Sequence, residues 1–147
     1  IRHIILANPE AELMSFERIG KQIRANSSSV TLYTNPGDRA LWFSQLLNTL
    51  ASDTPCQLKT SLGRHADSLW CEGGEEVLSV DVIDTSSLHS NINELRHSFF
   101  AISREMIEDL TDVVVRNLPA ERRPRLAKRA DKSVYDFCCA PANLYKI

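Results

Sequence analysis

An aspartate and a histidine are the residues of this chain whose types and spacing suit them to act together. Asp38 follows one β-rich run within four residues, and His97 comes after the next β-rich run. A carboxylate that is hydrogen-bonded to an imidazole holds its tautomer and stabilises the imidazolium that forms when the histidine takes a proton from a nucleophile. The pair therefore predicts part of a machinery for nucleophilic catalysis, with Asp38 as the acid and His97 as the base.

Strands and helices that alternate along the chain must position these two side chains. Short β-branched runs predict strands, and apolar residues three and four apart between charges predict amphipathic helices. The expected strands are residues 4–7, 30–34 and 76–84, and the expected helices are residues 12–24, 39–50 and 92–115. Asn35-Pro36-Gly37-Asp38 has the composition of a tight turn, and residues 51–74 are expected to be a long loop.

The alternation predicts an α/β fold with a mostly parallel sheet flanked by helices, because β-α-β units join parallel strands. In such a sheet, chemistry gathers in the loops at the carboxyl ends of the strands, where Asp38 and His97 are both expected. The middle helix carries its apolar residues on one stripe, formed by Phe43, Leu46, Leu47 and Leu50. Three strands are too few to hide the edges of a sheet. Because the chain also enters its first strand without a polar lead-in, we expect preceding strands, or another chain, to complete the fold.

Four stretches of the sequence resemble the DUF900 family of uncharacterised α/β-hydrolases. They are ILANPEAELMSF, VTLYTNPGDRALWFSQLL, VDVIDTSSL and RHSFF, in register over about residues 4–112. The family pattern leads from a strand ending in A-P-D to a Y-x-S-x-x-D-x-A-L turn, a V-x-x-I-D-V-S strand and a G-H-S-Y/F motif. The resemblance implies the C-terminal part of an α/β-hydrolase fold, with Asp38 as the triad acid and His97 as the triad base.

The chain departs from the family pattern at several positions. Arg96 stands before the histidine where the family usually has glycine, which alters how the histidine loop approaches the site. Tyr33-Thr34-Asn35 replaces a turn that contains serine, and Glu10 stands where aspartate is usual. The sequence contains no G-x-S-x-G nucleophile elbow. In the chain order of these hydrolases the nucleophile precedes the acid and the histidine, so the resemblance places it upstream of Ile1.

The resemblance implies a serine hydrolase, of an esterase or lipase-like type, that acts by acyl transfer on a small-molecule ester or acyl substrate. Such a reaction needs no cofactor and no metal. Residues 1–147 alone are expected to be inactive, because an acid and a base without a nucleophile and an oxyanion hole have nothing to activate. The alternative is a non-catalytic or truncated α/β-hydrolase-like module. A G-x-S-x-G motif in the preceding sequence would favour the enzyme.

Each candidate residue also has a structural alternative. Asp38 precedes a helix and has the type of a standard N-cap. His97 lies near two phenylalanines at the start of an apolar stripe, a setting typical of a structural histidine. Glu10, at the end of the first strand, is a rival for the triad acid, whereas Asp84 is more typical of a turn residue at a strand end.

Composition and charge exclude several classes of protein. The chain has 43% hydrophobic and 24% charged residues, as in soluble globular proteins. A net charge of −2 offers no whole-molecule attraction to nucleic acid. No run approaches the roughly 20 apolar residues of a transmembrane helix, and the first residues do not resemble a signal peptide. The four cysteines have no zinc-ligand spacing. Compartment and oligomeric state stay open.

The C-terminal end of the chain is more basic than the rest. Between Arg116 and Lys132 there are seven basic residues and two acidic ones. We therefore divide the chain into residues 1–115, the C-terminal half of an α/β-hydrolase domain, and residues 116–147, a basic C-terminal helix and tail. A single basic helix without interleaved aromatic residues is typical of a solvated face, and contact with an anionic surface is the alternative.

Overall fold

A twisted, mostly parallel sheet forms the frame of the structure, a computed structural model that describes residues 1–11, 13–50, 61–64, 80–88, 103–130 and 134–138. Its five strands have the order β1-β2-β3-β5-β4, and β4 runs antiparallel to β5. The strands are β1 (His3–Ala7), β2 (Ser29–Thr34), β3 (Asp81–Asp84), β4 (Leu126–Lys128) and β5 (Val134–Phe137). The helices are α1 (Leu13–Ala25), α2 (Arg39–Leu50), α3 (Arg104–Val114) and the short 3-10 turns η1 (Leu62–Arg64), η3 (Ser86–Leu88) and η5 (Ala120–Arg122). The predicted α/β fold class is confirmed.

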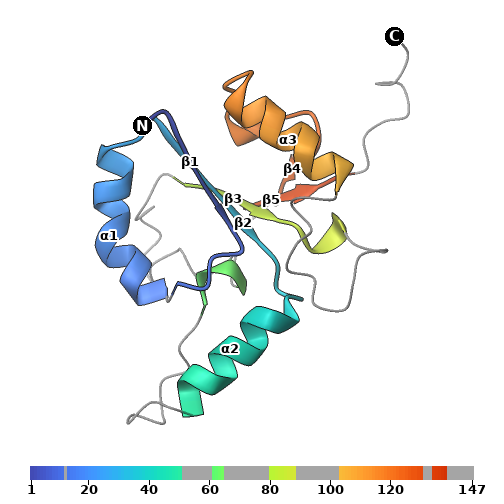
Figure 1. Cartoon of the computed structure of the whole chain (residues 1–147). Helices are drawn as coiled ribbons and strands as arrows, with labels where there is room; N and C mark the ends of the chain where they lie inside the picture. Colours follow the sequence, from blue (N-terminus) through green and yellow to red (C-terminus); the bar gives the residue numbers. More distant parts are fainter. Residues whose placement is uncertain (12, 51–60, 65–79, 89–102, 131–133, 139–147) are drawn as a thin grey trace.

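The side chains of β2 alternate between two apolar cores, one on each face of the sheet. Leu32 belongs to the first core together with Phe16 of α1, and Tyr33 belongs to the second together with Met106 of α3. Helices α1 and α3 lie on opposite sides of the sheet (Figure 1). Each fully buried aliphatic side chain in these cores contributes about 1.5–3 kcal/mol by leaving water. The sheet is therefore the middle of three layers, and β2 is covered on both faces.

The predicted strands and helices are largely confirmed where the structure describes them. The first helix and the first two strands agree with the expected bounds to within a residue or two, and α2 has the expected bounds. The third strand begins at Asp81, and residues 76–79 of its expected range lie outside the described residues. The prediction of one helix over residues 92–115 is wrong at residue 103, because Ser103 has an extended backbone and its side chain caps α3 by accepting from Met106 N. Within the described residues, no helix is both long and apolar enough to cross a bilayer.

Three residues of the apolar stripe that predicts α2 are exposed: Phe43 is 55% exposed, Leu46 40% and Leu47 50%. Among residues 39–47 of α2, whose burial is described, Leu41 is buried and 2% exposed. Periodicity therefore predicted the helix correctly, but it did not identify the face that packs within the described part of the chain.

The C-terminal segment corrects the prediction of a basic helix and tail after residue 115. After the turn η5, β4 and β5 form a strand pair, and β5 joins the sheet beside β3 in parallel. Pro119 and Pro124 prevent a continuous helix, and the apolar run of β5 is largely buried. The basic side chains are also not all solvated, since Arg123 is 3% exposed and Arg125 9%. Carboxylates from earlier elements bind both of these arginines.

Candidate active site

Asp38 lies in the turn between β2 and α2 and is fully buried. The turn closes when the Asp38 N–H donates to Asn35 O at 3.0 Å, and the Asn35 side chain accepts from Gly37 N at 3.0 Å. Asp38 Oδ1 accepts a hydrogen bond of 3.0 Å from the backbone N–H of Leu41, in the first turn of α2. The predicted turn and the predicted N-cap are both confirmed, because a side-chain oxygen here satisfies an otherwise unpaired helix donor.

The second oxygen of Asp38 faces the end of the neighbouring strand. Asn8 follows β1, and its Nδ2 donates to Asp38 Oδ2 at 2.9 Å. The parallel pairing of β1 with β2 brings these residues together, and the backbone N–H of Asn8 donates to Tyr33 O at 3.0 Å. Both oxygens of Asp38 therefore accept hydrogen bonds that orient the carboxylate.

The turn η1 closes the same end of the sheet. Gly63 accepts from Asn35 N at 2.7 Å and donates to Pro9 O at 2.9 Å, so it links the ends of β1 and β2. A Cβ atom at Gly63 would lie 2.6 Å from the carbonyl carbon of Asn8, which is too close for any side chain. The sequence predicted only a long loop at this position, because no local pattern identifies a glycine that packs against a backbone distant in the chain.

His97 lies outside the described residues, and its pairing with Asp38 stays a prediction. The structure does describe the end of the strand that precedes it. Strands β2 and β3 are parallel neighbours, with Thr34 in register with Asp84. Thr85 then donates its backbone N–H and its hydroxyl to Thr34 O, each at 2.8 Å. The carboxyl ends of the second and third strands therefore lie side by side, which is the spatial condition for a carboxylate after one to meet a histidine after the other.

The other carboxylates at this end of the sheet have different partners. Glu10, the rival acid, is exposed and accepts a hydrogen bond from Ser44 of α2. Asp84 accepts from Ser86 N at 2.8 Å, so its predicted role as a turn residue is confirmed, and it forms an ion pair of 2.6 Å with Arg129. Glu10 lacks the burial of Asp38, and Asp84 is buried but forms an ion pair with an arginine.

A second buried carboxylate, Asp109, lies on the α3 face of the sheet. The Tyr33 hydroxyl donates to its Oδ2 at 2.5 Å, and Arg123 donates to the same oxygen at 3.2 Å. Arg123 also reaches Thr31 Oγ1 and Asp81 Oδ2, each at 3.0 Å. Burial raises the pKa of the Asp109 carboxyl, although the Tyr33 hydrogen bond and the Arg123 charge oppose the rise. Burial, and then the charge of Asp109, also raise the pKa of Tyr33.

The sequence did not predict this buried cluster. Its members come from β2, β3, α3 and the segment after η5, and no short motif joins them. The basic residues after position 115 were the available signal, and they were assigned to a solvated face.

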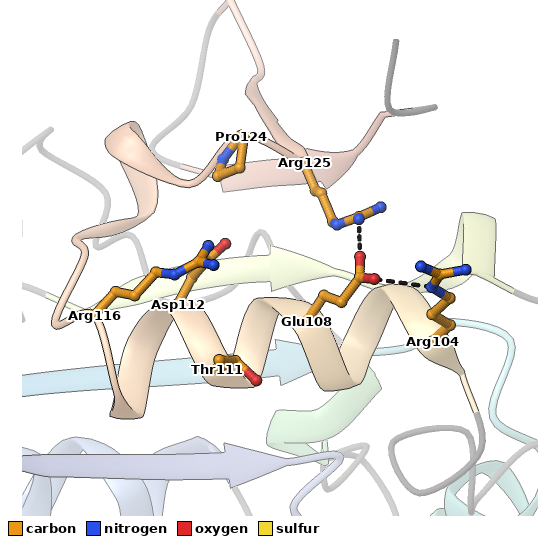
Figure 2. Close-up of a pocket in the computed structure, with 7 residues that line it drawn as sticks. All are labelled: Arg104, Glu108, Thr111, Asp112, Arg116, Pro124 and Arg125. Atoms are coloured by element: carbon orange, nitrogen blue, oxygen red, sulfur yellow. Dashed lines mark hydrogen bonds and ion pairs between the residues drawn. The ribbon is translucent and has the colours of Figure 1, made fainter. Parts of the chain in front are cut away.

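A pocket lies away from Asp38, between α3 and the segment that leads into β4. It has a volume of about 420 Å³, and Figure 2 shows its lining residues, which come from α3 and from the segment that leads into β4. The ion pair between Arg116 and Asp112 is 2.7 Å long, and Glu108 pairs with Arg104 at 2.8 Å and also with Arg125. Both carboxylates of this pocket are therefore engaged in ion pairs with arginines.

Comparisons with known proteins give one result. The model of a family described as "Alpha/beta hydrolase of unknown function (DUF900)" matches residues 1–116. No curated protein and no solved structure matches the chain. The matched span ends where α3 has ended and before η5, so the strand pair β4–β5 lies beyond it.

Proposed function

The chain belongs to the DUF900 family of α/β-hydrolases, and from that premise we propose that it is a serine hydrolase that transfers acyl groups from small ester substrates. In this proposal Asp38 is the orienting acid and His97 is the general base. The nucleophilic serine comes from sequence N-terminal to Ile1, because residues 1–147 contain no G-x-S-x-G motif and because the serine precedes the acid in this chain order.

The geometry of Asp38 is the observation that carries the proposal. It is a fully buried carboxylate at the carboxyl end of a central parallel strand, and hydrogen bonds orient both of its oxygens. In open α/β sheets this edge is where ligands bind. The adjacent parallel strand, β3, leads towards His97. A carboxylate in a fixed orientation can hold the tautomer of a histidine and stabilise the imidazolium that forms during the reaction.

The outer edge of β1 supports a nucleophile on a preceding strand. Within the described residues β1 pairs with β2 on one side, and its other side has no partner strand. The strand is half-buried along its whole length and is apolar after His3. Proteins rarely leave such an edge uncovered, because its free N–H and C=O groups pair with any passing strand. A strand added there would end beside Asn8 and Asp38.

The reaction proceeds in two acyl-transfer steps. His97 accepts the proton of the serine hydroxyl while the serine oxygen attacks the ester carbonyl carbon, and Asp38 stabilises the resulting imidazolium. The imidazolium returns that proton to the leaving alcohol as the ester C–O bond breaks. Water then attacks the acyl-enzyme with the same histidine as base, which releases the carboxylic acid and regenerates the serine.

Turnover of a p-nitrophenyl ester by the full-length protein tests the proposal. We expect His97→Ala to lower kcat by about 10³-fold or more, as for the removal of a triad base, with an unchanged circular dichroism spectrum. His89→Ala, in the same stretch of sequence, is the matched control and should retain activity. Residues 1–147 alone should not exceed the buffer rate. A fully active His97→Ala variant would exclude the triad assignment and favour a non-catalytic module.

A further inference from the structure

A buried asparagine on the strand next to Asp38 contacts the proposed acid. Asn8 is 2% exposed, and its Nδ2 lies 2.9 Å from Asp38 Oδ2. The N–H of Leu41 holds the other oxygen at 3.0 Å. The terminal torsion of an aspartate is soft and has no single preferred value. Two donors that approach different oxygens therefore constrain how this carboxylate is rotated.

The Asn8 amide directs its nitrogen at the Asp38 carboxylate and leaves its own oxygen without a hydrogen bond. Its Oδ1 is buried and makes no hydrogen bond within the described part of the chain. The reversed amide would direct this oxygen at Asp38 Oδ2, where two acceptors would repel each other. An unpaired buried acceptor destabilises a fold. The observed amide orientation therefore keeps the hydrogen bond to Asp38, although the amide oxygen remains unpaired.

The backbone of Asn8 is held in the conformation that this contact requires. Its φ of 43° lies in the left-handed region, which asparagine and glycine tolerate better than other residues. Gly63 packs against the same backbone, so closely that a Cβ at Gly63 would lie 2.6 Å from the Asn8 carbonyl carbon. Glycine at position 8 would satisfy the backbone equally well, but it would lack the amide.

Resting on the function proposed above, we propose that Asn8 is a positioning residue for the acid, whose amide holds the Asp38 carboxylate in the rotation that orients the catalytic histidine. Asn8 touches neither substrate nor nucleophile in this role, and it acts through Asp38. The end of β1 then contributes to catalysis without supplying a triad member. The closing turn η1 has a supporting part, because Gly63 keeps Asn8 in place.

Replacement by glycine separates the amide from the backbone. In the full-length protein, Asn8→Gly keeps the left-handed φ and removes the donor, and we expect kcat for ester hydrolysis to fall by about 10- to 100-fold, as for small misplacements of catalytic groups. KM should change by less than about twofold. The matched control is Asn117→Gly, because Asn117 also has a left-handed φ, of 58°, and lies in the exposed turn after α3. The control should retain wild-type kcat.

Replacement by aspartate gives a readout that a merely structural role would not change. Two carboxylates at hydrogen-bond distance share one proton, and the pair loses that proton only at raised pH. A protonated Asp side chain at position 8 donates as the amide does. Asn8→Asp should therefore retain part of its kcat at low pH and lose it as pH rises, along a limb that is absent from the wild-type profile.

The outcomes separate this inference from the proposed function. If Asp38→Asn is inactive while Asn8→Gly has wild-type kcat, the positioning role is wrong and the hydrolase proposal stands. If the wild-type protein hydrolyses no ester, the side-chain ¹⁵N–H₂ signal of Asn8 still decides whether the contact exists in solution. That signal should move in Asp38→Asn and stay in Asn117→Gly, and an unmoved signal in Asp38→Asn would overturn the positioning role.

Discussion

Two fully buried aspartates lie near β2, Asp38 in the turn at its carboxyl end and Asp109 on its α3 face, and their partners differ. Asp38 accepts hydrogen bonds from a neutral amide and from a helix N–H, whereas Asp109 is bound by the Tyr33 hydroxyl and by Arg123, whose side chain is 1% exposed. A buried guanidinium compensates the charge of its carboxylate within the fold. Burial by itself therefore does not distinguish the acid that we propose for catalysis from a carboxylate that cross-links the fold.

The two aspartates also stabilise different parts of the fold. Asp38 joins the carboxyl ends of β1 and β2 to the start of α2. Asp109 and Arg123 join α3 and the segment before β4 to the middle of the sheet. The first lies at the carboxyl edge of the sheet, where ligands bind in this architecture, and the second is a cross-link between layers. Substitutions at the two places should affect different measurements.

The largest expected effect is the loss of turnover in Asp38→Asn. The amide is isosteric and also caps helices, so we expect kcat of the full-length protein to fall by about 10³- to 10⁴-fold while the unfolding midpoint changes little. Asp109→Asn is the matched change in the other aspartate, and it should alter the unfolding midpoint and leave kcat of the folded protein near wild type. The opposite pattern, in which Asp109→Asn loses turnover and Asp38→Asn changes only the unfolding midpoint, would contradict this distinction.

Arg123→Leu should give the largest loss of stability. Its removal leaves the carboxylates of Asp81 and Asp109 without their buried cation, and breaking one side of a buried ion pair costs about 3–5 kcal/mol. Urea denaturation measures this loss as a shift of the midpoint at constant slope. Arg104→Leu is the control, because the Arg104 side chain is 69% exposed in its ion pair with Glu108. Exposed pairs contribute about 0–1 kcal/mol, so a similar loss in both variants would argue against the buried cross-link.

Tyr33→Phe removes one donor from Asp109 and should destabilise the protein by about 1–3 kcal/mol, as expected when a buried acceptor loses its partner. The ring still fills its place in the core, so packing is preserved. Chemical denaturation with intrinsic fluorescence is the measurement. In Asp109→Asn the same Tyr33→Phe change should cost less, because the charged acceptor is already gone. Equal costs in both backgrounds would show that the hydroxyl does not act through Asp109.

The pH dependence of stability should show the raised pKa of Asp109. A carboxyl whose folded pKa lies above its unfolded value binds its proton more readily in the folded state. Its contribution to stability is therefore fully present below the unfolded value of about 3.9 and is lost as pH rises through the folded pKa. Relative to Asp109→Asn, the wild-type protein should gain free energy of unfolding as pH falls through this window. A difference that stays constant with pH would contradict the direction.

The smallest effect is expected for Glu10→Gln. Glu10 is exposed and bonded to Ser44, so the substitution should change kcat by less than about twofold and stability by less than about 0.5 kcal/mol. It tests the rival acid directly, at the end of the strand next to that of Asp38. A loss of turnover as large as that expected for Asp38→Asn would indicate that Glu10 is the triad acid.

The local elements of the fold could be predicted from the sequence because their signals are local. The strands β1 and β2 follow from β-branched runs, α1 and α2 follow from helical periodicity, and the turn at Asp38 follows from its Asn-Pro-Gly-Asp composition. The C-terminal strands could not be predicted in the same way. The segments that become β4 and β5 are short, and they become strands because β3 offers an edge for pairing.

The sequence by itself determined the α/β class, the family, and Asp38 as a helix-capping acid after a buried strand, because each depends on residues close together in the chain. Only the tertiary structure decided which charges are compensated. Asn8 meets Asp38 across neighbouring strands, and Arg123 meets Asp109 between layers. The energy of a buried charge depends on which groups surround it, and these groups come from segments that only folding brings together.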